Sequence, residues 1–166
     1  MRFRSSVAGF TIIEMMVAVS IAAILLLVAA PSFKDASLGS QLRASADELM
    51  ASANLARSEA IKRNAPVTLC VSSDGANCGT DGWQQGWIVL SGTTVIYSRP
   101  QAPRGFVITA SSGATSLSFQ PTGVGATAAI FTICRATPSA GSQERVVTID
   151  ASGRASVKRT TTGTCA

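Results

Sequence analysis

The chain has 166 residues, 46% of them hydrophobic and 14% charged, and its net charge is +5. This balance excludes an intrinsically disordered chain, and the length fits one domain with an appendage. Without histidine, the chain cannot form a Ser-His-Asp or Cys-His catalytic group, and a metal site would have only cysteine and carboxylate ligands. No activated nucleophile is evident either. We therefore expect no enzyme, no cofactor and no metal site.

The apolar residues are concentrated near the N-terminus. Residues 15–30 include a single polar residue, Ser20, and extending this block back to Phe10 gives 21 residues, close to the length that spans a bilayer core. Glu14 lies inside the block. A carboxylate within a membrane segment is costly, and its presence indicates a functional role.

A short basic leader precedes the apolar block. It contains Arg2 and Arg4 and no acid, so the positive-inside rule places the N-terminus in the cytoplasm and the rest of the chain across the membrane. An ordinary secretory signal, cleaved near residues 28–30, is the alternative. Cleavage in such a signal follows the apolar run, whereas here the leader ends at Gly9, ahead of that run.

These N-terminal residues resemble the start of type IV prepilins and type II secretion pseudopilins. The resemblance is carried by Gly9, Phe10-Thr11-Ile12-Ile13-Glu14, the apolar block and Pro31. It implies that a prepilin peptidase cleaves after Gly9 and methylates the amine of Phe10. It further implies that Glu14 pairs with the N-terminal amine of a neighbouring subunit in the filament, and that Pro31 bends the helix, because proline lacks the N–H that a helix needs.

Three later segments narrow the resemblance to the GspH/FimT family of minor pilins and pseudopilins. They are Asn54–Arg63, similar to a helix end of that family, Asp81–Val89, with two tryptophans, and Leu117–Gly123, with an F-x-P-x-G turn. The resemblance implies a structural subunit that primes or caps a type IV pilus or a type II secretion pseudopilus. Its expected partners are the prepilin peptidase, other pilin subunits and the inner membrane. The residues do not distinguish the two filaments.

Beyond Pro31 the chain predicts an amphipathic helix. Apolar residues recur at steps of three and four, namely Leu38, Leu42, Ala46, Leu49, Ala53, Ala56 and Ala60, and form one stripe suited to dock against a sheet. Charged residues lie off this stripe, namely Arg43, Asp47, Glu48, Arg57, Glu59, Lys62 and Arg63. Residues 64–66 carry stop signals, so the helix is expected to end there.

From Pro66 onward, short β-rich runs alternate with turn residues. The predicted strands form one meander: Val67–Val71, Gly86–Leu90, Thr94–Ser98, Phe106–Ala110, Ser116–Gln120, Ala128–Cys134, Arg145–Ile149 and Arg154–Lys158. With the helix stripe as the second layer, we expect an α+β, type IV pilin-like fold, in which a long N-terminal helix packs on an antiparallel sheet. The expected parts are a leader at 1–9, a transmembrane and assembly helix at 10–31, an amphipathic half at 32–64 and a periplasmic β-rich domain at 65–166.

Four cysteines all fall in the part expected to be periplasmic, where disulfides persist. Four cysteines allow three pairings, and we favour Cys70–Cys78 and Cys134–Cys165. The spacing fits neither a zinc site nor a Cys-x-x-Cys redox pair.

Positive charge is concentrated in the C-terminal part. Residues 99–166 carry seven basic and two acidic side chains, whereas residues 10–98 carry five and seven. Gly153–Arg159 is similar to the G-R-x-R loop of FimT-like minor pilins that bind DNA, but Ser156 replaces the second arginine. DNA capture during uptake through Arg154, Lys158 and Arg159 is therefore the alternative function. It requires Lys158 and Arg159 to reach the same face, and a solvated surface or a subunit contact is the plainer interpretation.

Trp83 and Trp87 fall in a segment expected to be a strand. A spacing of four along a strand places both side chains on one face. We expect them to belong to the core or to be covered by the helix rather than to form a ligand platform.

Overall fold

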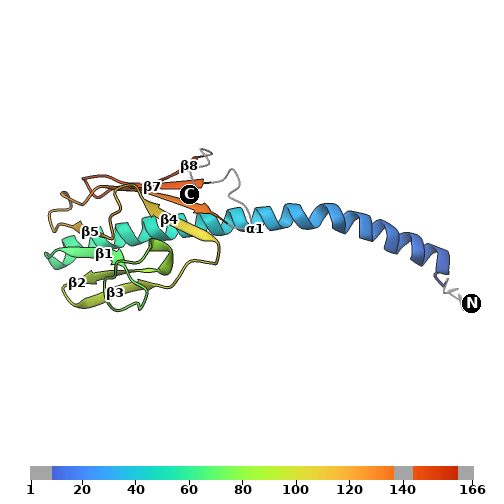
Figure 1. Ribbon diagram of the computed structural model, residues 1–166, viewed down its shortest axis with the longest axis horizontal. Helices are drawn as coiled ribbons and strands as arrows, with labels where there is room; N and C mark the ends of the chain where they lie inside the picture. Colours follow the sequence, from blue (N-terminus) through green and yellow to red (C-terminus); the bar gives the residue numbers. More distant parts are fainter. Residues whose placement is uncertain (1–8, 137–143, 161–166) are drawn as a thin grey trace, which may run out of the picture. The chain divides into compact units, whose positions relative to one another are not determined.

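The computed structural model describes residues 9–136 and 144–160, and it leaves out the side chains of residues 28–32, 34 and 35. The chain forms two compact units, residues 1–38 and 39–166. Helix α1, Ile12–Arg63, begins in the first unit and ends in the second (Figure 1). Among the described residues, no helical segment combines the length and the hydropathy needed to cross a membrane.

In the first unit, α1 begins at a capped turn. The Thr11 hydroxyl oxygen accepts a hydrogen bond from the Glu14 backbone N–H at 3.2 Å, as an N-cap residue does. The helix then continues through Pro31 and Gly39, as the sequence predicts. Its large apolar side chains from Phe10 to Leu27 are 53–81% exposed, so they do not pack within this chain.

In the second unit, α1 buries the predicted stripe. Six of its residues are at most 2% exposed: Leu42, Ala46, Leu49, Ala53, Ala56 and Ala60. The helix ends at Arg63 because Asn64 adopts a left-handed φ of 49°, a conformation that asparagine tolerates at helix C-termini. Pro66, which lacks a backbone N–H, follows two residues later.

In the described part of the chain, eight strands form two antiparallel four-stranded sheets. The strands are β1 (Val67–Val71), β2 (Trp87–Ser91), β3 (Thr94–Arg99), β4 (Phe106–Ala110), β5 (Ser116–Phe119), β6 (Ala129–Arg135), β7 (Glu144–Ile149) and β8 (Ala155–Thr160). The first sheet has the order β3-β2-β1-β5 and the second β4-β6-β7-β8. The predicted strand ranges agree to within one or two residues, but the prediction of a single meander is wrong. Instead, β1, β2 and β3 form one meander in the first sheet and β6, β7 and β8 form another in the second, while β5 pairs with β1 and β4 with β6.

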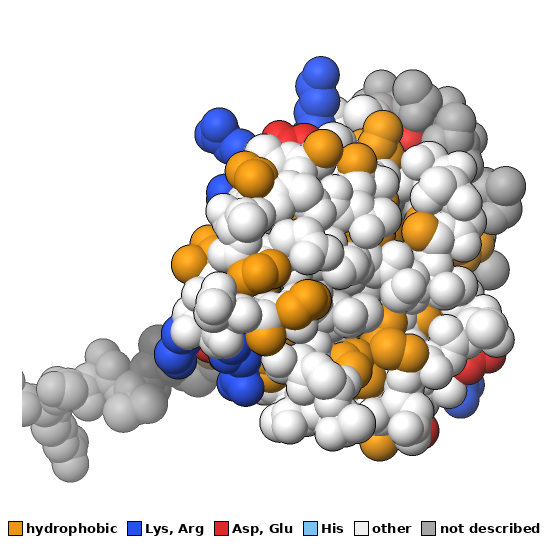
Figure 2. Space-filling view, turned by 90° about the vertical axis from the view of Figure 1, so that its left-hand side faces the viewer, with side chains coloured by type: hydrophobic (Ala, Val, Ile, Leu, Met, Phe, Trp, Pro, Cys, Tyr) orange, Lys and Arg blue, Asp and Glu red, His pale blue; other side chains and the backbone are white. Residues whose placement is uncertain are grey.

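The second half of α1 runs alongside both sheets (Figure 1). The inner faces of both sheets are buried, with side chains such as Leu69, Leu117, Phe131 and Val147 at 0% exposure. Figure 2 faces the end of this unit at which α1 ends, and the hydrophobic side chains there form separate spots among backbone and other side chains. The core therefore lies where the helix stripe meets the two sheets, as an α+β arrangement requires.

Candidate functional site

The predicted cleavage site lies ahead of the first helical turn. A Cβ added to Gly9 would meet no heavy atom within 4 Å, and no left-handed φ requires glycine there. The Phe10 side chain is 76% exposed. The fold therefore gives no reason for glycine at this position, so any requirement for it would come from a molecule that reads this segment.

Glu14 occupies the first turn of α1. Its backbone N–H is satisfied by Thr11, but none of the ion pairs in the described part of the chain involves its carboxylate. Exposed apolar side chains surround it along the helix, including Ile13 at 74% and Met15 at 58%. A carboxylate placed among apolar groups needs a cationic partner once water is removed. The Glu14 carboxylate is therefore placed where it can pair with a cationic group of another molecule.

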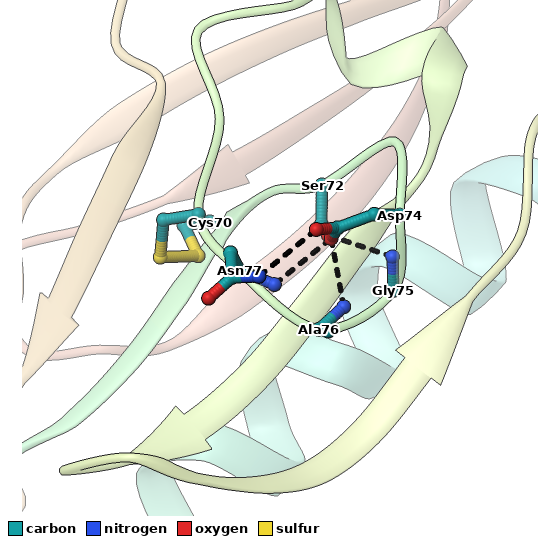
Figure 3. The surroundings of a disulfide bond; sticks show 7 residues. Cys70, Ser72, Asp74, Gly75, Ala76 and Asn77 are labelled. Carbon is teal, nitrogen blue, oxygen red and sulfur yellow. Dashed lines mark hydrogen bonds between the residues drawn. A yellow bond between two sulfur atoms is a disulfide. The ribbon is translucent and has the colours of Figure 1, made fainter.

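The first predicted disulfide, Cys70–Cys78, is confirmed (Figure 3), with a Cα–Cα distance of 5.5 Å. The loop that it closes is also held by the carboxylate of Asp74. This carboxylate accepts hydrogen bonds from the Ser72 hydroxyl at 2.9 Å, the Ala76 N–H at 2.8 Å, and the Asn77 N–H and side-chain amide at 2.9 and 3.0 Å. The Asn77 side chain, followed by the backbone N–H groups, lowers the pKa of Asp74 well below its usual range. The second predicted pair includes Cys165, which lies outside the described residues, so it stays a prediction.

Asp74→Asn should loosen this loop while leaving the disulfide intact. The amide N–H groups of Ala76 and Asn77 should lose protection in hydrogen exchange, because an asparagine side chain offers a single, uncharged acceptor oxygen. Asp81→Asn is the matched control, because Asp81 is exposed nearby. In the native chain, folding lowers the pKa of Asp74. The ionised carboxylate therefore stabilises the loop fully at any pH above the ordinary aspartate pKa. This stabilisation is lost only as pH falls through the folded-state value. Loss of protection at pH 5 would contradict this account.

Both tryptophans are buried, as predicted, with Trp83 at 3% and Trp87 at 0% exposure. Trp83 is not in a strand, however: it begins the 3-10 helix η1, Trp83–Gln85. Its ring contacts Phe131 of the second sheet at a centroid distance of 4.9 Å. The Trp87 indole N–H donates to the Ser52 hydroxyl of α1 at 2.9 Å. The tryptophans therefore join the layers of the fold and offer no ligand platform.

A charged pair with a buried arginine and a half-exposed glutamate ties α1 to the first sheet, and the sequence did not reveal it. The Arg99 side chain is 9% exposed and contacts Glu48 at 2.8 Å, while its guanidinium lies 4.6 Å from the centre of the Trp87 ring. A planar guanidinium can stack on an aromatic ring in this way while it still binds a carboxylate. Glu48 and Arg99 are 51 residues apart in the sequence. The only sequence feature that could have indicated their contact is the position of Glu48 beside the apolar stripe.

Arg57 connects the C-terminal part of α1 to two loops. Its Nε–H donates to the Gly123 carbonyl at 3.0 Å. Gly153 has a φ of 74°, and a Cβ there would lie 3.2 Å from the Cδ of Arg57. The helix end, the F-x-P-x-G turn and the Gly153 loop, which are far apart in the sequence, therefore meet at the Arg57 side chain.

The three candidate DNA-binding residues do not share a face. Arg154 is exposed and precedes β8, while Lys158 and Arg159 are consecutive residues within that strand. Consecutive side chains of a strand point to opposite faces. In the strand register, Arg159 lies opposite Arg145 of β7. The condition on which this hypothesis depended is not met.

Nor does the described part of the chain contain a group of three or more cysteine, aspartate or glutamate residues that could hold a metal ion.

Two family models match the chain. The prokaryotic N-terminal methylation motif matches residues 4–30, and the type II transport protein GspH model matches residues 45–153, about two thirds of the length. The chain belongs to the GspH family. This is a family of minor pilins and pseudopilins, which are structural subunits that assemble with other pilin subunits in filaments. No significant match was found among functionally curated proteins.

Solved structures of two such subunits share the fold. The type IV minor pilin FimU of Pseudomonas aeruginosa is 22% identical, with a TM-score of 0.58 over 72% of this chain and 89% of FimU. The minor pseudopilin EpsH of the type 2 secretion system of Vibrio cholerae is 15% identical, with a TM-score of 0.52 over 72% of this chain and 97% of EpsH. The expected pilin-like fold, with an N-terminal helix packed on antiparallel sheets, is confirmed.

Proposed function

We propose that this GspH-family chain primes or caps assembly of a type IV pilus or a type II secretion pseudopilus. It does so after a prepilin peptidase has cleaved between Gly9 and Phe10 and methylated the new N-terminus. The observation that carries the proposal is the N-terminal segment itself. A glycine that the fold does not require is followed by a helix whose apolar side chains are exposed and whose only acid in that block lacks an ion-pair partner among the described residues.

Assembly then follows from the chemistry of this segment. Burying the exposed apolar side chains against neighbouring helices supplies packing energy. The Glu14 carboxylate, placed in the same apolar layer, pairs with the Phe10 amine of an adjacent subunit. Opposite charges attract strongly where water is excluded, so this pair sets the register of one subunit against the next.

The same segment supports a location. We infer that residues 10–31 anchor the subunit in the inner membrane before assembly and that residues 65–166 lie in the periplasm. Support comes from the basic leader, which favours a cytoplasmic N-terminus, and from the Cys70–Cys78 disulfide, which suits an oxidising compartment. No structural observation favours the DNA-binding alternative, so only the assembly role is proposed.

Gly9→Leu tests the processing step. Its larger side chain should block entry of the segment into the peptidase while leaving the fold unchanged, because the space around Gly9 is open. Intact-mass measurement of the membrane fraction should show an uncut chain that lacks the added methyl group. Ala22→Leu, a comparable enlargement within the apolar block, should be cleaved and methylated normally. Normal cleavage of the Gly9 variant would show that the site is assigned wrongly.

A further inference from the structure

Most of the net charge of the second unit lies at one end. Residues 39–166 contain eleven basic and seven acidic side chains, and the segments outside the described ranges add none. Six basic residues, Arg43, Arg104, Arg135, Arg145, Lys158 and Arg159, lie at one end with two acids, Asp47 and Glu144. We call this the arginine end. These eight residues carry an excess of four positive charges. Glu48, which contacts Arg99 one residue after Asp47, and Asp74, which lines a hollow with Arg99, also lie toward this end, and with these three residues the excess is three.

Strand register brings these residues together. Arg135, the last residue of β6, pairs with Phe106, the first residue of β4, and Arg104 lies just before it. Arg145, near the start of β7, pairs with Arg159, near the end of β8. Arg43 and Asp47 of α1 act electrostatically on Arg145, so this is the end at which α1 enters the second unit. Figure 2 faces the opposite end, where acidic and basic side chains both appear.

Three arginines from three elements face one another here. Arg145 and Arg159 are directly opposed on neighbouring strands, an arrangement that is destabilising for like charges. Burial, then Arg159 and Arg43, lower the pKa of Arg145, and Asp47 opposes them. Asp47 is already shared with Arg43 at 3.6 Å, and their side chains are 49% and 75% exposed. Asp47 offsets only part of this repulsion inside the chain, so an anionic partner from outside would lower the remaining cost.

We propose that the arginine end binds the anionic phospholipid headgroups of the bilayer that anchors the subunit, an inference that rests on the proposed membrane anchoring. Twelve residues lie between Ala30, the last residue of the apolar block, and Arg43. While helical, this connection spans only about 20 Å, whatever angle the two units make. Anionic headgroups attract basic residues within about one Debye length of the surface, roughly 8–10 Å. The connection thus holds the arginine end within about two Debye lengths of the edge of the apolar block, so the headgroups are close to its positive charge, which favours lipid over a partner that must be captured from solution.

The two tryptophans allow a test without added labels on the protein. Both lie in the second unit, so energy transfer from them to dansyl-labelled headgroups reports how closely this unit approaches the bilayer. The full chain is reconstituted in vesicles of phosphatidylcholine alone or with phosphatidylglycerol. We expect about twofold more transfer in the phosphatidylglycerol vesicles, and we expect this gain to vanish in high salt, where surface charges are screened.

Two triple variants remove the same number of positive charges from opposite ends. Arg43→Gln, Arg145→Gln and Arg159→Gln together should abolish the gain in transfer. Lys62→Gln, Arg63→Gln and Arg154→Gln together should preserve it, because these exposed residues lie at the other end. Equal loss in both variants would show an effect of total charge alone and would overturn the proposal.

The remaining outcomes are also decisive. A chain that fails to float with phosphatidylcholine vesicles would contradict the membrane anchoring of the proposed function. A chain that floats but shows transfer independent of lipid charge would overturn only the headgroup contact. If the arginine-end variant keeps its lipid response but fails to enter filaments, or loses retention of a short DNA duplex, the surface serves another subunit or nucleic acid. The lipid assignment would then be wrong.

Discussion

Glu14→Ala should leave cleavage and methylation intact but lower incorporation into filaments by at least about tenfold, because it leaves the neighbouring Phe10 amine without its partner in an apolar layer. Alanine is a strong helix former, so the loss would not reflect a broken helix. Immunoblots of sheared filaments, normalised to the membrane pool, measure the effect.

Two further substitutions separate charge from shape at this position. Glu14→Gln keeps the size of the side chain and removes its charge, so it should fail like the alanine variant. Glu14→Asp keeps the charge on a shorter side chain and should restore part of the incorporation. If the alanine variant enters filaments at the normal level, Glu14 does not set the register between subunits.

Gly86→Ala should destabilise the second unit by about 4 kcal/mol, which combines strain in a backbone region open mainly to glycine with overpacking. Gly86 has a φ of 121° and a ψ of 172°. A Cβ there would lie 2.6 Å from the Arg99 carbonyl oxygen and 2.8 Å from that of Ser72. Because both obstacles are backbone atoms, neither can move aside easily. Urea unfolding of the chain with its disulfides intact, followed by tryptophan fluorescence, measures the change.

Gly92 offers a matched control at another turn. Its φ of 58° is also left-handed, but a Cβ there would meet nothing within 4 Å. Gly92→Ala should therefore cost only about 1 kcal/mol, which is the backbone strain alone. Similar losses in the two variants would contradict the steric account of Gly86.

Local patterns were sufficient to predict the elements of this fold. The end of α1 follows from Asn64 and Pro66, and the buried stripe follows from its helical spacing, because both depend on residues close in the sequence. The start of α1 close to Phe10 was predictable for the same reason. Burial of the tryptophans was also predicted, although the turn between Gly82 and Gly86 places Trp83 in a 3-10 helix.

Pairings across long stretches of chain were beyond such patterns. The chain crosses to the second sheet at β4 and back to the first at β5, which pairs with β1. No local sequence pattern indicates these two crossings. The contacts of Arg57 with Gly123 and of Glu48 with Arg99 each join residues more than 50 positions apart. The arginine end likewise arises only from register, since its members come from the helix and four strands or their flanking loops.

The contacts of α1 with the sheets also determine how the subunit carries load. Glu48, Ser52 and Arg57 hold successive turns of the helix through Arg99, Trp87 and Gly123. A pull along the helix axis acts on all three contacts in shear, so they must yield together rather than peel apart one after another. Tension that reaches the helix in an assembled filament would thus spread over the ten residues from Glu48 to Arg57 before it reaches the loops.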